Sequence, residues 1–447
     1  MSGERSPGRK LAIVVLIGAM LAVPLMMVYA LLWDRQDQAQ TARASISRGW
    51  GGVQSLSGPV IVIPYRKQSV ETVTENGRQT SRTVETEHQL LLAPVDDRAQ
   101  FDLDTEKRSK NIYDSVVYTA KVGGQAQFAI PDDIERLGVK RADLMLDRAE
   151  IRFGISDPRG LRDEKSLSVD GQALELRPGN GLATTNGSGI FAFFDWQAKQ
   201  GAPIGVTYKY VVRGTEQISM MPEAASSEWT ITSDWPHPGF GGDFLPDDSR
   251  IRDNGFAARY AVSNLALGRS TITLPGGDGV IGPRQSVTVD MVQPVNLYNQ
   301  IDRSVKYGFL FIAFTFVAFL MFDIIGGARV AAAEYLLTGV GLILFFVLLL
   351  AFSEVIGFTP AYLLASAAII GLISAYSSAV LRSRKRGGFI AAMLTGLYAL
   401  LYVLLNLEAF SLLIGSVLLF VALAGIMYMT RNIDWSGLGK GEEAMAE

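Results

Sequence analysis

The sequence predicts an integral membrane protein with six transmembrane helices and one large β-rich, sandwich-like domain on the outer side of the membrane. Three observations predict this class. The mean hydropathy over 447 residues is +0.22, and 49% of the residues are hydrophobic. The apolar residues gather into six runs close to the length of about 20 residues that a helix needs to cross a bilayer. The interval 33–305 has no such run and shows short apolar stretches bounded by Gly, Pro, Asn and Asp, a pattern typical of β-strands.

Composition excludes several functional classes. The 41 basic and 44 acidic residues give a net charge of −3, which offers no electrostatic basis for a nucleic-acid partner. Cysteine is absent, which excludes disulfides, thiolate catalysis and Cys-ligated metal sites. The two histidines, His88 and His237, are too few for a His-rich metal site within one chain. We therefore expect neither a metal nor a cofactor.

The first transmembrane helix is predicted at residues 11–32, after a cytoplasmic tail at 1–10. The run from Leu11 to Leu32 carries no charge and is long enough to span the membrane. The alternative is a cleaved signal peptide, because 28–30 (Val-Tyr-Ala) loosely resembles a cleavage site. Signal peptides have shorter apolar regions of about 7–15 residues, so we expect an uncleaved anchor.

Residues 33–305 are predicted to form the β-rich outer domain. A short apolar run at Pro59–Pro64 lies between two prolines, and Asn76-Gly77 is a hairpin signal between two strand-like stretches. Many short strands separated by turn residues predict an antiparallel sandwich. Only Thr41–Arg48 and Asp132–Leu137 are helical in character.

A five-helix bundle is predicted at residues 306–430, followed by a cytoplasmic tail at 431–447. The five apolar runs are Tyr307–Gly327, Tyr335–Ser353, Pro360–Leu381, Phe389–Leu407 and Ser411–Met429. With six spans, the short basic segments fall on the inner side: the N-terminal tail, the loop at Arg382–Arg386 and the tail from Arg431. Both termini are therefore expected in the cytoplasm, and 33–305 outside it.

Several motifs along the chain carry a family resemblance. The densest is Ser233–Pro246, which reads Ser-Asp-Trp-Pro-His-Pro-Gly-Phe-Gly-Gly-Asp-Phe-Leu-Pro. The others are Gly58–Tyr65, Asn111–Tyr113, Ile155–Leu161, Lys306–Ile312, Ser353–Phe358 and Thr430–Trp435. Together they resemble the CreD family of cell-envelope integrity proteins, over about residues 45–435. The resemblance implies a bacterial inner-membrane protein with a periplasmic domain, linked to the envelope stress response, colicin tolerance and the β-lactam response.

Two positions depart from the family pattern. The family tends to have His-Pro-x-Gln-Tyr where this sequence has Ala331–Tyr335, and it tends to have His where this sequence has Val355. A mechanism that titrates those histidines is therefore not expected in this chain.

The candidate ligand-binding residues are Trp235, His237, Phe240, Asp243 and Phe244. Prolines on both sides of His237 fix the backbone, and the aromatic rings supply flat faces for a sugar or a peptide. The alternative is a structural loop that closes one end of the sandwich. The acids of this stretch could also form a carboxylate pair for glycoside hydrolysis, but sequence spacing cannot establish the separation that this reaction needs.

Three acids at or inside the predicted spans are further candidates: Asp323, Glu354 and Glu408. A carboxylate within a bilayer is costly and often functional, so a transporter is an alternative function. These acids lie near the ends of the apolar runs, whereas a proton-coupled transporter needs such groups near the midplane.

The sequence thus predicts a non-enzymatic inner-membrane envelope-integrity protein without catalytic residues. Its expected partners are the lipid bilayer and an envelope ligand or an inner-membrane protein. The alternatives are a transporter or lipid-handling protein that uses the helical bundle, and a periplasmic hydrolase of envelope polysaccharide.

Overall fold

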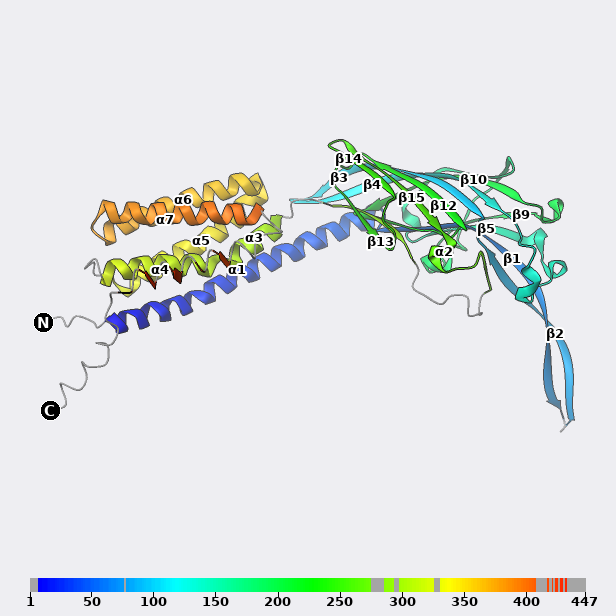
Figure 1. Cartoon of the computed structure of the whole chain (residues 1–447), viewed down its shortest axis with the longest axis horizontal. Coiled ribbons are helices and arrows are strands. Elements are labelled where there is room, and N and C mark those ends of the chain that lie inside the picture. Colours follow the sequence, from blue (N-terminus) through cyan, green and yellow to red (C-terminus); the bar gives the residue numbers. More distant parts are fainter. Residues whose placement is uncertain are drawn as a thin grey trace. The chain divides into compact units, whose positions relative to one another are not determined.

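The computed structural model of the full chain describes residues 7–75, 78–274, 285–292, 297–324 and 330–406, with single positions between 416 and 431. The chain divides into two compact units. Met1–Gln40 and Val295–Glu447 form the helical unit, and Thr41–Pro294 form the β unit. The first boundary falls inside one continuous helix, α1 (Pro7–Trp50) (Figure 1).

Helix α1 is longer than the apolar run that predicts it. At 1.5 Å per residue its 44 residues extend about 66 Å, roughly twice the thickness of a bilayer core. Residues from 33 onward were predicted to belong to the β-rich domain, with helical character at Thr41–Arg48. They continue the helix because the segment 33–50 is rich in Gln, Ala and Arg, which favour helix, and poor in β-branched residues.

The helical unit contains the remaining long helices: α3 (Leu297–Lys306), α4 (Gly308–Ile324), α5 (Ala332–Ile356), α6 (Phe358–Val380) and α7 (Arg384–Asn406). Within the described residues, five helical segments are long and apolar enough to cross a membrane, with α3 and α4 counted together as one. The sixth predicted span, Ser411–Met429, lies largely outside the described residues. The number of spans therefore stays a prediction.

Aromatic side chains fill the space between α5, α6 and α7. The ring of Phe345 lies 4.5 Å from the ring of Tyr398 and 5.5 Å from that of Tyr362, centroid to centroid. The Tyr362 hydroxyl donates a hydrogen bond of 2.7 Å to the backbone carbonyl of Tyr398. In an apolar surrounding an unpaired hydroxyl is costly, so this bond fixes α6 against α7.

The β unit contains two mixed sheets. Within the described residues the first has nine strands. Its main path runs β13 (Pro238–Gly242), β17 (Val287–Met291), β11 (Gln217–Met221), β1 (Gln54–Glu75), β5 (Ala149–Ile155), β9 (Gly189–Phe194), β8 (Arg177–Pro178); β2 (Arg78–Leu92) pairs with β1 and with β16 (Ile272–Thr273). The second sheet has eight strands: β14 (Asp248–Arg252), β15 (Gly255–Ser263), β12 (Ser226–Ser233), β3 (Asp96–Lys110), β4 (Tyr113–Phe128), β10 (Ile204–Thr215), β6 (Leu161–Val169) and β7 (Gln172–Leu174).

Short helices connect the strands. They are η1 (Ile134–Leu137), η2 (Arg141–Asp143), η3 (Leu146–Arg148), η4 (Pro158–Gly160), η5 (Ala183–Thr185), η6 (Gln197–Lys199) and α2 (Asn264–Leu267). The helix predicted at Asp132–Leu137 corresponds to η1.

The two sheets share one hydrophobic core. Strand β15 shows how alternation builds it: Phe256, Ala258 and Tyr260 are buried, and the residues between them are exposed. Phe153 of the first sheet contacts Tyr208 of the second at a ring-centroid distance of 5.3 Å. The predicted sheets were antiparallel, but β1 pairs with β11 and β12 pairs with β3 in parallel. Local alternation sets the buried face of a strand and does not set the direction of its neighbour.

Strands β1 and β2 form a long hairpin, which extends at the right of Figure 1. Their register places Glu75 opposite Arg78, as a two-residue connection requires. The predicted turn residues, Asn76-Gly77, lie outside the described residues.

The C-terminal end of α1 is tightly held within the β unit. The guanidinium groups of Arg213 and Arg108 lie 4.0 Å and 4.4 Å from the centre of the Trp50 ring, and the indole N–H donates to the carbonyl of Tyr118 at 3.2 Å. The backbone N–H of Gly52 donates to the Asp157 carboxylate at 3.0 Å. Hydrogen bonding from Arg159, with smaller help from the Gly52 N–H, lowers the pKa of Asp157 to about 2.

Candidate functional site

A pocket of about 300 Å³ lies on the outer face of the first sheet. The alternation of side chains along β1 identifies the face. Ile61 and Ile63 belong to the shared core, whereas Val60, which follows a bulge in the strand, lines the pocket. The two strands beside β1 contribute Leu91 of β2 and Arg152 of β5.

Two chain segments roof the pocket, residues 181–184 and residues 269–273. The first is a tight loop in which a Cβ atom at Gly181 would lie 2.0 Å from the carbonyl oxygen of Ser188, so glycine is required there. The second is held to β2 because the Ala93 N–H donates to the Thr271 carbonyl at 2.8 Å and β16 follows directly. Both segments are therefore fixed by backbone contacts.

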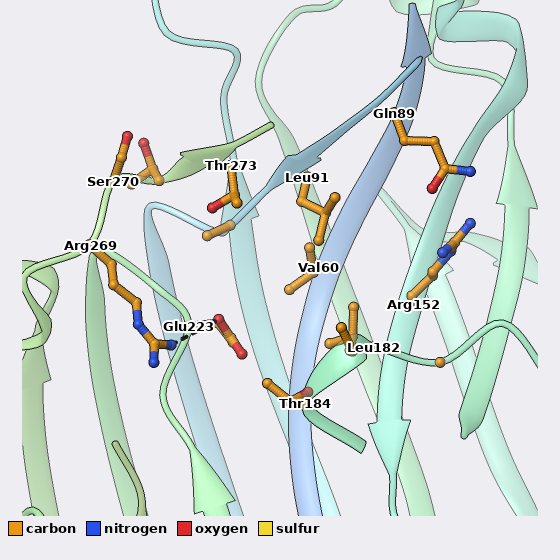
Figure 2. Close-up of a pocket in the computed structure, with 14 residues that line it drawn as sticks. Val60, Gln89, Leu91, Arg152, Leu182, Thr184, Glu223, Arg269, Ser270 and Thr273 are labelled. Carbon is orange, nitrogen blue, oxygen red and sulfur yellow. Dashed lines mark ion pairs between the residues drawn. The ribbon is translucent and has the colours of Figure 1, made fainter. Parts of the chain in front are cut away.

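The middle of the pocket is aliphatic and its two sides are polar. Val60 and Leu182 are each 4% exposed and, with Leu91, form the middle. Figure 2 shows Arg269 and Glu223 on one side of these residues, and Arg152 and Gln89 on the other.

The ion pairs on the two sides differ in the distance between their charged atoms. Arg152 donates to the Glu150 carboxylate at 2.7 Å, so its charge is closely paired. The nearest guanidinium nitrogen of Arg269 lies 3.9 Å from a carboxylate oxygen of Glu223, which is beyond hydrogen-bond distance. The other oxygen of Glu223 accepts a hydrogen bond of 2.7 Å from the Ser57 hydroxyl, which orients this carboxylate.

Two polar atoms of the lining are buried and lack a hydrogen-bond partner within the described protein. They are the Thr184 hydroxyl oxygen and Nη2 of Arg269. A buried donor without a partner costs about 1–3 kcal/mol. Neither atom has accessible surface, so the candidate binding site is defined by the pocket itself and by the aliphatic and polar residues that line it.

The predicted ligand loop takes a different place in the fold, at the edges of both sheets. Trp235 is 8% exposed, and its indole N–H donates to the Val292 carbonyl at 3.1 Å. Phe240 lies in β13 and contacts Phe256 at 5.5 Å between ring centroids, and Phe244 is half-buried against the core. His237 is exposed.

The acids of this loop bind backbone groups. Asp234 accepts hydrogen bonds from the Thr105 N–H and hydroxyl at 2.9 Å and 2.7 Å. Asp243 accepts from the Ser286 N–H at 2.8 Å. In the part of the chain that the structure describes, no group of three or more His, Asp or Glu side chains could hold a metal ion.

Two of the predicted membrane acids lie in the helical unit next to basic or hydroxyl groups. Asp323 is 5% exposed, and its carboxylate lies 2.9 Å from the ammonium of Lys10 at the start of α1. Glu354 accepts a hydrogen bond from the Tyr298 hydroxyl at 3.1 Å and lies 3.8 Å from Arg35. The third acid, Glu408, lies outside the described residues.

Comparison with known proteins decides the family. The model of the inner membrane protein CreD family matches residues 6–436. The chain belongs to the CreD family. It is 33% identical over 422 residues to the inner membrane protein CreD of Escherichia coli strain K12, which covers 93% of this chain and 91% of that protein. This establishes a multi-pass bacterial inner-membrane protein, with its helices in a lipid bilayer.

One solved structure is also similar in part. A candidate protease from Parabacteroides distasonis aligns with a TM-score of 0.22 and 7% identity, over 50% of this chain and 46% of that one. At this TM-score the likeness carries no argument about fold or chemistry.

Sequence reasoning did not single out the pocket residues. Thr184, Glu223 and Arg269 stand in three separate connections between strands, and each is an ordinary polar residue in a turn-rich stretch. The signal that did exist was the apolar run at Val60–Ile63: all four residues are buried, which shows that both faces of β1 are covered.

Proposed function

We propose that this CreD-family protein is a non-enzymatic cell-envelope integrity protein whose β unit binds an envelope ligand in the pocket roofed by 181–184 and 269–273. Both termini lie in the cytoplasm and the β unit lies in the periplasm. The observation that carries the proposal is a pocket of about 300 Å³ with aliphatic residues in its middle and charged residues on two sides. Concave, largely preformed pockets with a few polar groups are typical of ligand sites.

Binding without catalysis is supported by how the carboxylates are used. Glycoside hydrolysis needs two carboxyl groups that face one bond of the substrate. Asp234 and Asp243 instead accept hydrogen bonds from the backbone N–H groups of Thr105, in β3, and of Ser286, which precedes β17. Their geometry supports a role in fixing the strand edges.

The ion pairs of the helical unit support placing the activity in the β unit. Asp323 is paired with Lys10, and Glu354 lies beside Tyr298 and Arg35. Carboxylates satisfied in this way join helices, whereas a proton carrier has to exchange its partner with substrate or water. Transport is therefore not the function that this geometry favours.

Complementation with a blocked pocket tests the proposal. Ala183 is exposed and lines the pocket, so Ala183→Trp fills the space without changing the core. A strain that lacks the gene would receive the wild-type chain or this variant and be scored for sensitivity to detergent, colicin and β-lactam. We expect the wild type to restore resistance and the variant to fail.

The matched control is Ala198→Trp, because Ala198 is exposed in η6 just as Ala183 is in η5, and it does not line this pocket. Expression and membrane insertion of all three chains are measured in parallel. If Ala183→Trp restores resistance as fully as Ala198→Trp, the pocket is not the working site.

A further inference from the structure

A group of basic side chains lies at the connection between α6 and α7. The stretch 358–406, which holds both helices, contains no Asp or Glu, and its basic residues all fall at 382–386. Arg382, Arg384 and Lys385 are exposed, and none of them forms an ion pair with another residue that the structure describes. These three residues are called the basic turn below. Within the described chain, its positive charge is uncompensated.

The carboxylates at this end of the helical unit bind other groups. The guanidinium of Arg386 lies 5.8 Å from the ring centroid of Phe322, which places the basic turn near the end of α4. The next residue of α4, Asp323, is paired with Lys10 at 2.9 Å. Glu334 accepts a hydrogen bond of 2.7 Å from a backbone N–H at the start of α5. The structure thus shows each carboxylate bound to another partner and neither bound to the basic turn.

Backbone contacts hold the connection in one shape. The N–H of Ser383 donates to the carbonyl of Ser378 at 3.1 Å, and the N–H of Gly387 donates to the carbonyl of Ser383 at 3.1 Å. A Cβ atom at Gly387 would overlap the Ser378 hydroxyl, so α6 and α7 approach each other closely here. Arg382 has a φ of 49°, in the left-handed region that favours glycine. The backbone alone does not select a charged residue at this position.

The lengths of α6 and α7 place the basic turn at the level of the lipid headgroups. Each helix has 23 residues and extends about 35 Å, against about 30 Å for the bilayer core. Phe389 is 53% exposed and follows Lys385 by four residues, so both lie on the same face of α7. A cationic group next to an exposed apolar ring matches a lipid, which joins a charged headgroup to an apolar chain. A soluble anion would use the charge without the ring.

We propose that the basic turn binds the phosphate group of an anionic phospholipid whose acyl chain lies against Phe389. Guanidinium and ammonium groups donate charge-assisted hydrogen bonds to phosphate oxygens, and basic clusters at the ends of membrane spans attract anionic headgroups. The surface belongs to the helical unit, so the inference goes beyond the proposed function and does not depend on the pocket of the β unit.

Lipid binding to the purified full chain tests the inference. The probe is a short-chain phosphatidylglycerol, added to the chain in a non-ionic detergent and followed by native mass spectrometry. Phosphatidylcholine of the same chain length carries the phosphate without a net charge, and glycerol phosphate carries the charge without acyl chains. We expect phosphatidylglycerol to bind more tightly than both, and to bind more weakly as the salt concentration rises.

Two variants place the lipid at the basic turn. Arg384→Gln and Lys385→Gln each remove one charge from an exposed position, and each should weaken phosphatidylglycerol binding about fivefold. The matched control is Lys306→Gln, because Lys306 also lies at a helix end of the helical unit but is paired with Asp302 at 2.5 Å. This control should bind the lipid as the wild type does. Thermal unfolding in the same detergent verifies that each variant is folded.

Three results would overturn the inference. Phosphatidylglycerol binds the wild type no more tightly than phosphatidylcholine, glycerol phosphate binds as tightly as the lipid and so identifies a soluble phosphate as the ligand, or both Gln variants of the basic turn bind as Lys306→Gln does. The proposed function is judged separately, because it stands if Ala183→Trp fails in complementation and falls if that variant restores resistance.

Discussion

Raising the pH from about 4 to 7 should destabilise the β unit through one buried carboxyl group, that of Asp97. Asp97 is 3% exposed and accepts hydrogen bonds from the Tyr208 hydroxyl at 2.8 Å and the Trp229 indole at 2.9 Å. Burial raises its pKa from 3.8 to about 6, although the two hydrogen bonds act in the opposite direction.

The sign and size follow from linkage. A carboxyl with a raised pKa in the folded state holds its proton more tightly when folded, so its contribution to stability is full below about pH 4 and is lost as the pH rises through about 6. One pKa unit corresponds to about 1.4 kcal/mol, so the loss amounts to about 3 kcal/mol. Asp97→Asn cannot ionise and should remove this part of the pH dependence.

Urea unfolding of the full chain in detergent, followed by tryptophan fluorescence at pH 4, 5, 6 and 7, measures the effect. Trp229 reports directly, because its indole N–H contacts the carboxylate. Asp104→Asn, which changes an exposed carboxyl of the same strand, is the matched control. Parallel stability curves for wild type and Asp97→Asn between pH 4 and 7 would refute the reasoning.

Further predictions concern the ion pair, the end of α1 and the ligand loop. Asp323→Asn should destabilise the helical unit by about 2 kcal/mol because it leaves Lys10 unpaired. This lies between about 0–1 kcal/mol for an exposed pair and about 3–5 kcal/mol for a buried one, since the Lys10 side chain is 29% exposed. Exchange of the two charged residues should restore stability in a thermal unfolding assay, and no recovery would argue against a structural pair. Trp50→Ala should lower the free energy of unfolding by about 2–3 kcal/mol, because it removes two cation–π contacts and one hydrogen bond. Trp50→Phe should lower it by about 1 kcal/mol. Equal losses for the two variants in urea unfolding would contradict this account. Trp235→Ala should lower the melting temperature and His237→Ala should not, because Trp235 is buried and His237 is exposed. If His237→Ala alone abolished complementation, a binding role for the loop would gain support.

Much of the fold could be predicted from patterns along the chain. The apolar runs correspond to α1, α4, α5, α6 and α7, because a span needs a long uncharged stretch wherever it occurs. The run at Pro59–Pro64 lies in β1, and the helix predicted at Asp132–Leu137 corresponds to η1. These elements depend on local sequence, so local rules describe them.

Other features depend on contacts between distant segments. The parallel pairing of β1 with β11 joins residues more than 160 positions apart, as in Gln54 opposite Ile218, and nothing near either strand encodes it. The helical character predicted at Thr41–Arg48 is part of α1, but the continuity of that helix from residue 33 was missed because polar sequence was equated with the outer domain, although Gln, Ala and Arg favour helix.

The candidate site was the hardest feature to predict. The stretch Trp235–Phe244 is dense in Pro, Gly and aromatic residues, which indicate either recognition or a tight strand connection. The structure uses Trp235 and Phe240 in packing, and a binding role for the loop stays a prediction. Thr184 and Arg269 are brought together only by the sheet beneath them, so no spacing in the sequence could reveal the pocket.

Photo-crosslinking in living cells tests the central claim most directly. Benzoylphenylalanine is placed at position 183, on the pocket, or at position 198, on the matched surface, in the full chain, and cells are irradiated before purification. The account predicts that the peptide containing position 183 gains a small adduct by mass spectrometry that the peptide containing position 198 lacks. An adduct profile at position 183 that is the same as at position 198 would contradict it.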